Sequence, residues 1–227
     1  MTATPITLFL GPTAYGVDKA LLQHEDVILK PPARRGDVER LLDEALAPGV
    51  LAIADGTFHA FPAVGHVEIR HALEEGWTVW GLCSMGAIRA AEMHTLGVRG
   101  FGAVYQHYAD DSDLDDDEVA LMHAVEAPHR PMSEPLIHLR EFTGYLVQKS
   151  HLSPKDSDEI NASLKRRWYA DRTIPLMRSL LVDSFGCDKQ VIAREIDEFD
   201  RFRLKQSDLI RFLEDAPWKN TTGHGGD

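Results

Sequence analysis

The segment Trp77–Glu92, WTVWGLCSMGAIRAAE, changes character in its middle. The part up to Gly81 is apolar and rich in residues that favour strands, whereas the part after Gly86 is rich in residues that favour helices. The polar pair Cys83-Ser84 therefore falls on a turn between a strand and a helix. Such a turn lifts one side chain clear of the sheet and points the first free N–H groups of the helix at the same place.

This turn matches half of the hydrolase nucleophile pattern G-x-S-x-G in two different ways. Centred on Ser84, the second glycine is present as Gly86; centred on Cys83, the first glycine is present as Gly81. The pattern thus leaves open which side chain is the nucleophile. An interpretation without catalysis is also open, in which the glycines allow close packing of strand and helix and Ser84 caps the helix.

The first half of the chain alternates short apolar runs with amphipathic ones. This alternation is typical of βαβ units and predicts an α/β fold with a mainly parallel sheet flanked by helices. The expected strands are Ile6–Leu10, Val27–Leu29, Val50–Ala54 and Thr78–Leu82, with Phe101–Tyr105 as a fifth candidate. The expected helices are Asp18–Gln23, Asp37–Ala47, Val64–Glu75 and Met85–Leu96.

From about Asp115 the pattern predicts helices alone. They are expected at Glu118–Val125, Glu134–Ser150, Pro154–Tyr169, Ile174–Phe185, Lys189–Phe202 and Ser207–Leu213. The sequence thus predicts an α/β hydrolase-like core at residues 1–114 and a helical region, expected to dock a partner, at residues 115–216. The polar, glycine-rich residues 217–227 are expected to form a flexible tail.

The composition is that of a globular protein with no disulfide framework. The 227 residues include 44% hydrophobic residues and 2 cysteines, and the formal net charge is −12. This charge disfavours nucleic-acid binding, which needs concentrated Lys and Arg, and favours a protein partner. No apolar run approaches the roughly 20 residues of a membrane-spanning helix. Because Met1–Pro5 also lacks the basic start of a signal peptide, we expect a cytoplasmic protein. The two cysteines are too few for a Cys-rich zinc site, and we expect no metal site and no cofactor.

Two loops resemble ligand-binding motifs incompletely. Gly11 and Gly16 have the spacing of a phosphate-binding loop, but the Lys-Ser/Thr pair that should follow is absent. The acidic run Asp110–Glu118 lacks the glycine and the final glutamate of a calcium loop. A turn that borders the site and a solvated acidic run before a helix are the better interpretations.

The polar residues that follow the predicted strands are expected to meet at one edge of the sheet. In a parallel sheet this is the edge formed by the carboxyl ends of the strands, where such folds place their sites. The runs in question are Gly11-Pro12-Thr13, Lys30-Pro31-Pro32, Asp55-Gly56 and Cys83-Ser84.

Lys30 is the first candidate for a general base in this cluster, and Lys19 is the second. Lys30 follows an apolar strand and is held on extended backbone by two prolines. A partly desolvated lysine there can become neutral and accept a proton from a serine hydroxyl. The alternative for either residue is an ordinary exposed lysine.

Four further residues are expected near the same edge. Asp55, His66 and Glu68 can orient a base, contact a partner or cap a helix. Arg89 can contact a partner or form an ion pair with Glu92.

An ordered set of motifs resembles the TfuA-like proteins. The motifs are Gly11-Pro12-Thr13, Pro31-Pro32-Ala33-x-x-Gly36-Asp37, Asp55-Gly56-x-Phe58, His66-x-Glu68-Ile69, Ser84–Glu92 and Asp115–Ala120. The resemblance covers roughly Ile6 to Ala120, and its specificity comes from the number and order of the motifs.

The resemblance implies a partner of YcaO enzymes in peptide backbone thioamidation, a step of modified-peptide biosynthesis. It implies hydrolysis of the C-terminal thiocarboxylate of a ubiquitin-like sulfur-carrier protein, so that sulfide reaches the YcaO enzyme and its precursor peptide. The family's Ser–Lys pair maps onto Ser84 and, by the position before Pro-Pro, onto Lys30.

In this interpretation the N–H groups of Met85 and Gly86, joined by those near Gly11, Pro12 and Thr13, stabilise the oxyanion. A non-catalytic adaptor that recruits substrate to a YcaO enzyme is the alternative function. An acyl-transferring or amidohydrolase enzyme unrelated to sulfur is a third.

Overall fold

A computed structural model describes residues 5–57, 61–126 and 128–220. The chain forms two compact units, one made of residues 1–114 and 205–227 and the other of residues 115–204. Phe58, part of one of the motifs above, lies outside the described residues. Among the described residues, no helix has both the length and the apolar character that crossing a bilayer requires.

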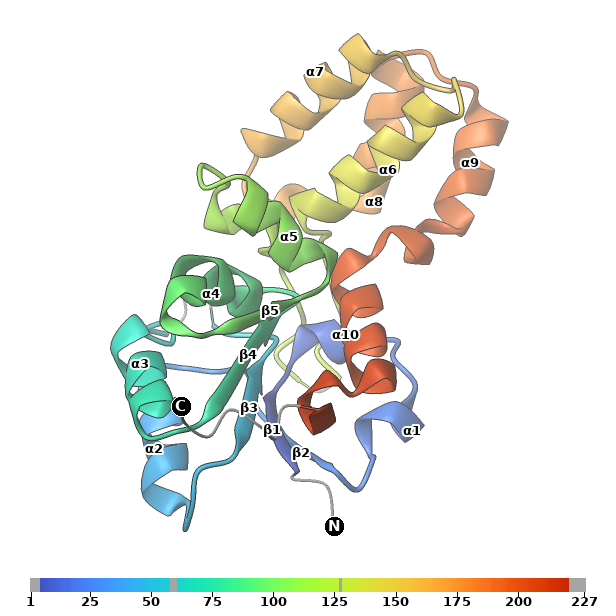
Figure 1. The fold of residues 1–227 in the computed structure, drawn as a ribbon. Helices are drawn as coiled ribbons and strands as arrows, with labels where there is room; N and C mark the ends of the chain where they lie inside the picture. Colours follow the sequence, from blue (N-terminus) through green and yellow to red (C-terminus); the bar gives the residue numbers. More distant parts are fainter. Residues whose placement is uncertain (1–4, 58–60, 127, 221–227) are drawn as a thin grey trace. The chain divides into compact units, whose positions relative to one another are not determined.

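A five-stranded parallel sheet forms the centre of the first unit (Figure 1). The strands are β1 (Ile6–Phe9), β2 (Val27–Lys30), β3 (Val50–Ile53), β4 (Thr78–Leu82) and β5 (Arg99–Phe101). Their order across the sheet is β2-β1-β3-β4-β5. The predicted α/β fold, with a mainly parallel sheet, flanking helices and further helices toward the C-terminus, is confirmed.

Helices cover both faces of this sheet. They are α1 (Lys19–Leu22), α2 (Asp37–Glu44), α3 (His66–Glu74), α4 (Met85–Met93), α5 (Gly102–Asp110) and α10 (Leu204–Asp215), with short 3-10 helices η1 (Pro12–Ala14), η2 (His94–Leu96) and η7 (Pro217–Asn220). Because successive strand residues point to opposite faces, the sheet has two separate apolar clusters. One includes side chains of α2, α3 and α4, and the other includes Leu209 and Phe212 of α10 and Trp218 of η7.

The helix α10 thus packs in the core of the first unit, although the sequence groups it with the helical region. Phe212 makes edge-to-face contacts with Trp80 and Phe101, with ring centroids 5.7 and 5.2 Å apart. Residues 217–220, which the sequence assigns to a tail, form η7, and Trp218 is buried. Residues 221–227 lie outside the described residues.

The predicted strand Phe101–Tyr105 is wrong, because β5 ends at Phe101 and α5 begins at Gly102. Gly102 has φ +93°, and this conformation turns the chain out of the sheet. The buried Asp208 carboxylate then accepts hydrogen bonds from the N–H groups of Ala103 and Val104 at 2.8 and 2.9 Å. A carboxylate supplied by α10 therefore satisfies the first turn of α5.

The second unit is helical. It contains α6 (Leu136–Gln148), α7 (Pro154–Lys165), α8 (Ile174–Ser179) and α9 (Lys189–Asp197), the 3-10 helices η3 (Asp116–Glu118), η4 (Tyr169–Asp171) and η6 (Phe199–Phe202), and the π-helix η5 (Leu180–Ser184).

The predicted helix Glu118–Val125 is wrong. After η3 the chain doubles back, and the Met122 carbonyl accepts from the N–H groups of Met132 and Ser133. Pro131 has no N–H group and disfavours helical backbone before it.

The acidic run before α6 is not simply a solvated surface. Glu118 is buried and accepts two hydrogen bonds from Arg140, at 2.9 and 3.0 Å, and one from Lys165 at 3.1 Å. Asp117 pairs with Lys165 and with the fully buried Arg172. These ion pairs tie the run to α6, α7 and the segment before α8.

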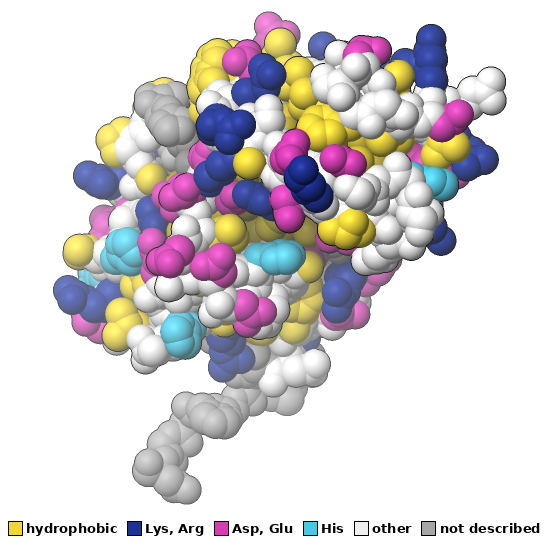
Figure 2. All heavy atoms as spheres, turned by 90° about the horizontal axis from the view of Figure 1, so that it is seen from above, with side chains coloured by type: hydrophobic (Ala, Val, Ile, Leu, Met, Phe, Trp, Pro, Cys, Tyr) yellow, Lys and Arg dark blue, Asp and Glu magenta, His cyan; other side chains and the backbone are white. Residues whose placement is uncertain are grey.

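The molecular face drawn in Figure 2 carries acidic and basic side chains interspersed with one another. Phosphate backbones are bound by concentrations of Lys and Arg. The face drawn there offers no such concentration, in keeping with the net charge of −12.

Candidate active site

The turn between β4 and α4 has the strand-to-helix geometry that the sequence predicts. β4 ends at Leu82, α4 begins at Met85, and the Ser84 N–H donates to the Leu82 carbonyl at 2.7 Å. Cys83, at the centre of this tight turn, has φ +64°. That conformation is costly for a residue with a side chain and is held only where the surroundings enforce it. A strained turn after a strand is the setting in which α/β-hydrolases hold their nucleophile.

Two glycines allow the close contact of strand and helix at this turn. A Cβ atom on Gly86 would lie 1.6 Å from the Ile53 carbonyl oxygen, and one on Gly81 would lie 2.0 Å from the Gly86 carbonyl oxygen. Any side chain at either position would therefore push α4 off the sheet. Packing accounts for both glycines, whatever chemistry the turn performs.

Ser84 is the N-cap residue of α4, yet its side chain does not cap the helix. Within the described residues, its hydroxyl makes no hydrogen bond and the N–H groups of Met85 and Gly86 meet no acceptor. The hydroxyl of an N-cap serine normally accepts a hydrogen bond from the second or third N–H group of its helix. The interpretation of Ser84 as a helix cap is therefore not supported, and a hydroxyl and two helix N–H donors lie together without a partner among the described residues.

Cys83 has the opposite character. Its side chain is fully buried in the apolar cluster on the α10 side of the sheet. Burial raises the pKa of the Cys83 thiol well above its usual value, the charges of Asp208 and Asp55 raise it further, and Lys205 acts in the opposite direction. A reactive cysteine needs a lowered pKa, because the thiolate is the nucleophile. The thiol of Cys83 is therefore a packing group, and Ser84 is the better candidate nucleophile.

Asp55 organises the loop that follows β1. Its buried carboxylate accepts from the Gly11 N–H at 2.9 Å, from the Thr13 N–H at 3.0 Å and from the Thr13 hydroxyl at 2.7 Å. Pro12 has no N–H group. The loop donors that the sequence assigns to an oxyanion site are thus already used by Asp55, so of the predicted oxyanion donors only the N–H groups of Met85 and Gly86 lack an acceptor within the described residues.

A lysine that the sequence analysis does not identify lies beside Asp55. The Lys205 ammonium, at the start of α10, is 3.9 Å from Asp55 Oδ1, and the two side chains are 2% and 3% exposed. Both charges act on the Cys83 thiol, so both lie near the β4–α4 turn. Ile53 pairs with Gly81 in the sheet, and Asp55 and Cys83 each lie two residues further along their adjacent strands. Asp55, Lys205 and the turn that carries Ser84 thus occupy the same edge of the sheet.

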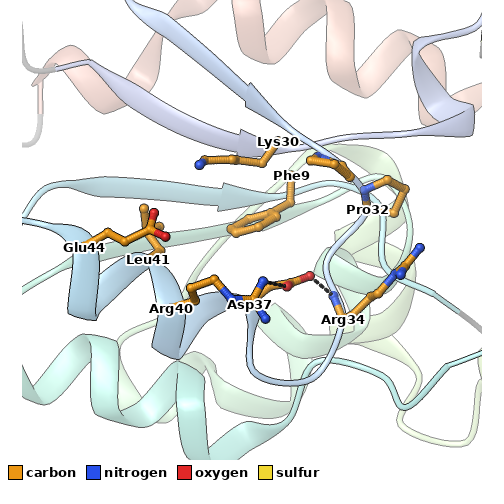
Figure 3. Close-up of a pocket in the computed structure, with 9 residues that line it drawn as sticks. Phe9, Lys30, Pro32, Arg34, Asp37, Arg40, Leu41 and Glu44 are labelled. Carbon is orange, nitrogen blue, oxygen red and sulfur yellow. Dashed lines mark hydrogen bonds and ion pairs between the residues drawn. The ribbon is translucent and has the colours of Figure 1, made fainter.

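Lys30 lies elsewhere. It ends the edge strand β2, and β1 and β3 separate that strand from β4. Three strand spacings of about 4.8 Å place the two backbones about 14 Å apart. The Lys30 side chain lines a pocket of about 370 Å³ and points toward Leu41 and Glu44 of α2 (Figure 3). The pairing of Lys30 with Ser84 gains no support from this geometry.

Lys19, the second lysine candidate, begins α1 and is exposed. The position of Lys19 thus offers none of the desolvation on which its candidacy depends.

Three other candidates form contacts within the first unit. The buried Glu68 carboxylate accepts from the N–H groups of Gly36, Val38 and Gly65 at 2.9, 3.2 and 2.8 Å. These donors lie at the starts of α2 and α3, where a negative charge is favourable. His66 and Arg89 both bind the Glu92 carboxylate, at 2.8 and 2.6 Å. These contacts give Glu68 a structural role at two helix starts and make His66 and Arg89 part of one ion-pair cluster.

Replacing Glu68 with Gln is expected to destabilise the protein by about 2 kcal/mol, because the substitution removes the charge and turns an amide N–H₂ group toward backbone donors. Denaturant unfolding measures the change. Glu74→Gln, on the same helix, is the matched control, since Glu74 is exposed and pairs with the exposed Arg70. The control should change stability by less than about 0.5 kcal/mol. Equal effects of the two substitutions would contradict the structural role of Glu68.

The TfuA-like protein family model matches residues 55–173, slightly more than half of the chain. The matched segment begins at Asp55 and contains the β4–α4 turn with Ser84, whereas Lys205 lies beyond it. A comparison with curated proteins gives no match.

Proposed function

Because the chain belongs to the TfuA-like family, whose members act beside YcaO enzymes in peptide thioamidation, we propose that it hydrolyses a thiocarboxylated ubiquitin-like sulfur carrier. The sulfide released is delivered to the YcaO enzyme. The observation that carries the proposal is Ser84, an N-cap serine whose hydroxyl does not cap its helix. A hydroxyl beside unused helix N–H groups has the parts that acyl transfer requires.

Lys205 supplies the amine of the Ser–Lys pair in this proposal, in place of Lys30. It is buried at the edge of the sheet where Ser84 lies, next to Asp55. Ser84 and Asp55 are each 2% exposed, so the proposal requires an acyl group that is narrow and extended rather than bulky. The C-terminal end of a carrier protein has that form.

The reaction begins with a thiocarboxylate, which is an anion and resists nucleophilic attack. The Lys205 ammonium gives a proton to the thiocarboxylate sulfur, and the neutral amine then takes the proton of the Ser84 hydroxyl as its oxygen attacks the carbon. The N–H groups of Met85 and Gly86 hold the oxyanion; one such donor typically contributes about 3 kcal/mol. The carbon–sulfur bond breaks and leaves an ester on Ser84.

The second half of the reaction returns the site to its starting state. The departing hydrosulfide takes a proton from Lys205 and leaves as hydrogen sulfide. Neutral Lys205 accepts one proton of a water molecule as that water attacks the ester, and Ser84 leaves with the other proton of the water and recovers its hydroxyl. The sum is thiocarboxylate plus water giving carboxylate plus hydrogen sulfide, with Lys205 again an ammonium.

The test is to trap the ester. The protein is mixed with thiocarboxylated carrier and quenched in acid, and mass spectrometry locates the attached carrier. The ester is expected on Ser84, in the wild type and equally in Cys83→Ala, because the Cys83 thiol is a packing group. A thioester on Cys83 would overturn the assignment of the nucleophile. If no adduct forms and no sulfide is released while a YcaO enzyme still binds, the protein is an adaptor.

A further inference from the structure

The pair formed by Asp55 and Lys205 has a consequence for substrate choice. The ammonium and Asp55 Oδ1 are 3.9 Å apart, and both side chains are almost completely removed from water. A carboxylate at this distance favours the charged form of a lysine, and the effect is strongest where water is excluded. A lysine that serves only as a base would work better without such a neighbour, because a base must be neutral.

We propose that Asp55 keeps Lys205 protonated in the resting site, so that the site accepts acyl groups whose leaving atom is negatively charged and discriminates against neutral thioesters. This inference rests on the proposed function and adds a specificity to it. Asp55 is a positioning residue here, because it acts through Lys205. An anionic thiocarboxylate uses the resting ammonium both as a binding partner and as a proton donor. A neutral thioester offers no charge to bind and needs the amine in its neutral form from the start.

The geometry of Asp55 suits this role. Its Oδ2 accepts from the Gly11 and Thr13 N–H groups and its Oδ1 accepts from the Thr13 hydroxyl, so the carboxylate cannot turn away from Lys205. The carboxylate that faces Lys205 is thus fixed in place by the loop after β1.

The other titratable groups around Lys205 do not replace Asp55. Asp208 lies three residues further along α10, but its oxygens accept from Ala103 and Val104, and burial raises its pKa. His107 and Arg211 act on Asp208 in the opposite direction. Cys83 carries a neutral thiol. Among the described contacts, the Asp55 carboxylate lies 3.9 Å from the ammonium.

Asp55→Asn tests the proposal on the full-length protein with two forms of one carrier, the thiocarboxylate and its methyl thioester. The Asn oxygen can still accept from the Gly11 and Thr13 N–H groups, so the loop keeps an anchor. At neutral pH, hydrolysis of the thiocarboxylate is expected to fall by about tenfold or more, whereas hydrolysis of the thioester is expected to rise. For the thiocarboxylate, the loss of activity at high pH should begin at a lower pH than in the wild type, because the carboxylate that favours the charged form of Lys205 is gone.

A merely structural role for Asp55 would lower both rates together and leave the pH profile in place, and that result would overturn the inference. Lys219→Met is the matched control, because Lys219 is a lysine of the same unit that pairs with Asp26 instead. It should change neither rate. A wild-type protein that hydrolyses neither substrate would refute the proposed function, and the inference with it; a wild type that hydrolyses both equally well would refute the inference alone.

Discussion

Ser84→Ala is expected to lower the rate of sulfide release from thiocarboxylated carrier by about 10³-fold or more. The substitution removes the attacking oxygen and leaves the helix N–H groups in place. Ser84 is buried and its hydroxyl makes no hydrogen bond within the described residues, so the fold should tolerate alanine well. Sulfide release measured under single-turnover conditions reports the chemical step directly.

Ser133→Ala is a matched control for this result. Ser133 is also buried, but its hydroxyl accepts a hydrogen bond from the Met122 N–H in the second unit. Its loss should reduce stability by about 1 kcal/mol and leave the rate unchanged. If Ser84→Ala released sulfide as fast as the wild type while remaining folded, Ser84 would not be the nucleophile.

Lys205→Met is expected to lower the same rate by about 10²-fold or more, because four proton transfers of the proposed mechanism pass through this amine. Methionine keeps much of the length and the apolar stem of lysine, so packing at the start of α10 is largely retained. Lys30→Met should leave the rate close to that of the wild type, since Lys30 lies on β2 and its side chain points into the pocket beside α2.

The two lysine variants distinguish the sequence-based assignment from the structural one. Loss of activity in Lys30→Met with retention in Lys205→Met would restore Lys30 as the amine of the pair. Thermal unfolding of both variants separates a lost catalytic group from a lost fold. It matters most for Lys205→Met, because that variant leaves the buried Asp55 without its cationic neighbour.

The strand-to-helix turn could be predicted from the sequence because its signal is local. The apolar run before Gly81 and the helix-forming run after Gly86 each span a few residues, and two glycines mark where strand and helix meet. The fold class follows from the repetition of such runs. The conformation of Cys83 could not be predicted in this way, because it follows from how α4 packs on β3 and β4.

Lys205 could not be predicted because nothing near it in the sequence marks it. It begins an ordinary amphipathic helix, and its burial beside Asp55 arises only when α10 packs on the sheet. Lys30 is predicted as the base because Pro31 and Pro32 follow it, but these prolines fix the local backbone and not the distance between Lys30 and Ser84. The strand order, with β1 and β3 between β2 and β4, sets that distance.

For Glu68, too, the local structure could be predicted from the sequence, whereas the contacts with distant residues could not. Its position at the start of a helix could be predicted, but its bonds to the Gly36 and Val38 N–H groups link two helices that are separate in the sequence. The incorrect strand at Phe101–Tyr105 has a related cause. The residue types in this segment favour a strand, but the Asp208 carboxylate accepts hydrogen bonds from the Ala103 and Val104 N–H groups and so stabilises the start of a helix there.

The interrupted first unit also constrains how the protein is made. Its sheet is complete by Phe101, yet α10 and η7, which supply Phe212 and Trp218 to one side of that sheet, are the last described segments of the chain. A ribosome therefore finishes every strand long before it releases the helix that closes the core. Until α10 and η7 have been synthesised, the apolar surface around Trp80 lacks the side chains that cover it, so the growing chain depends on their synthesis, or on a chaperone, to avoid aggregation.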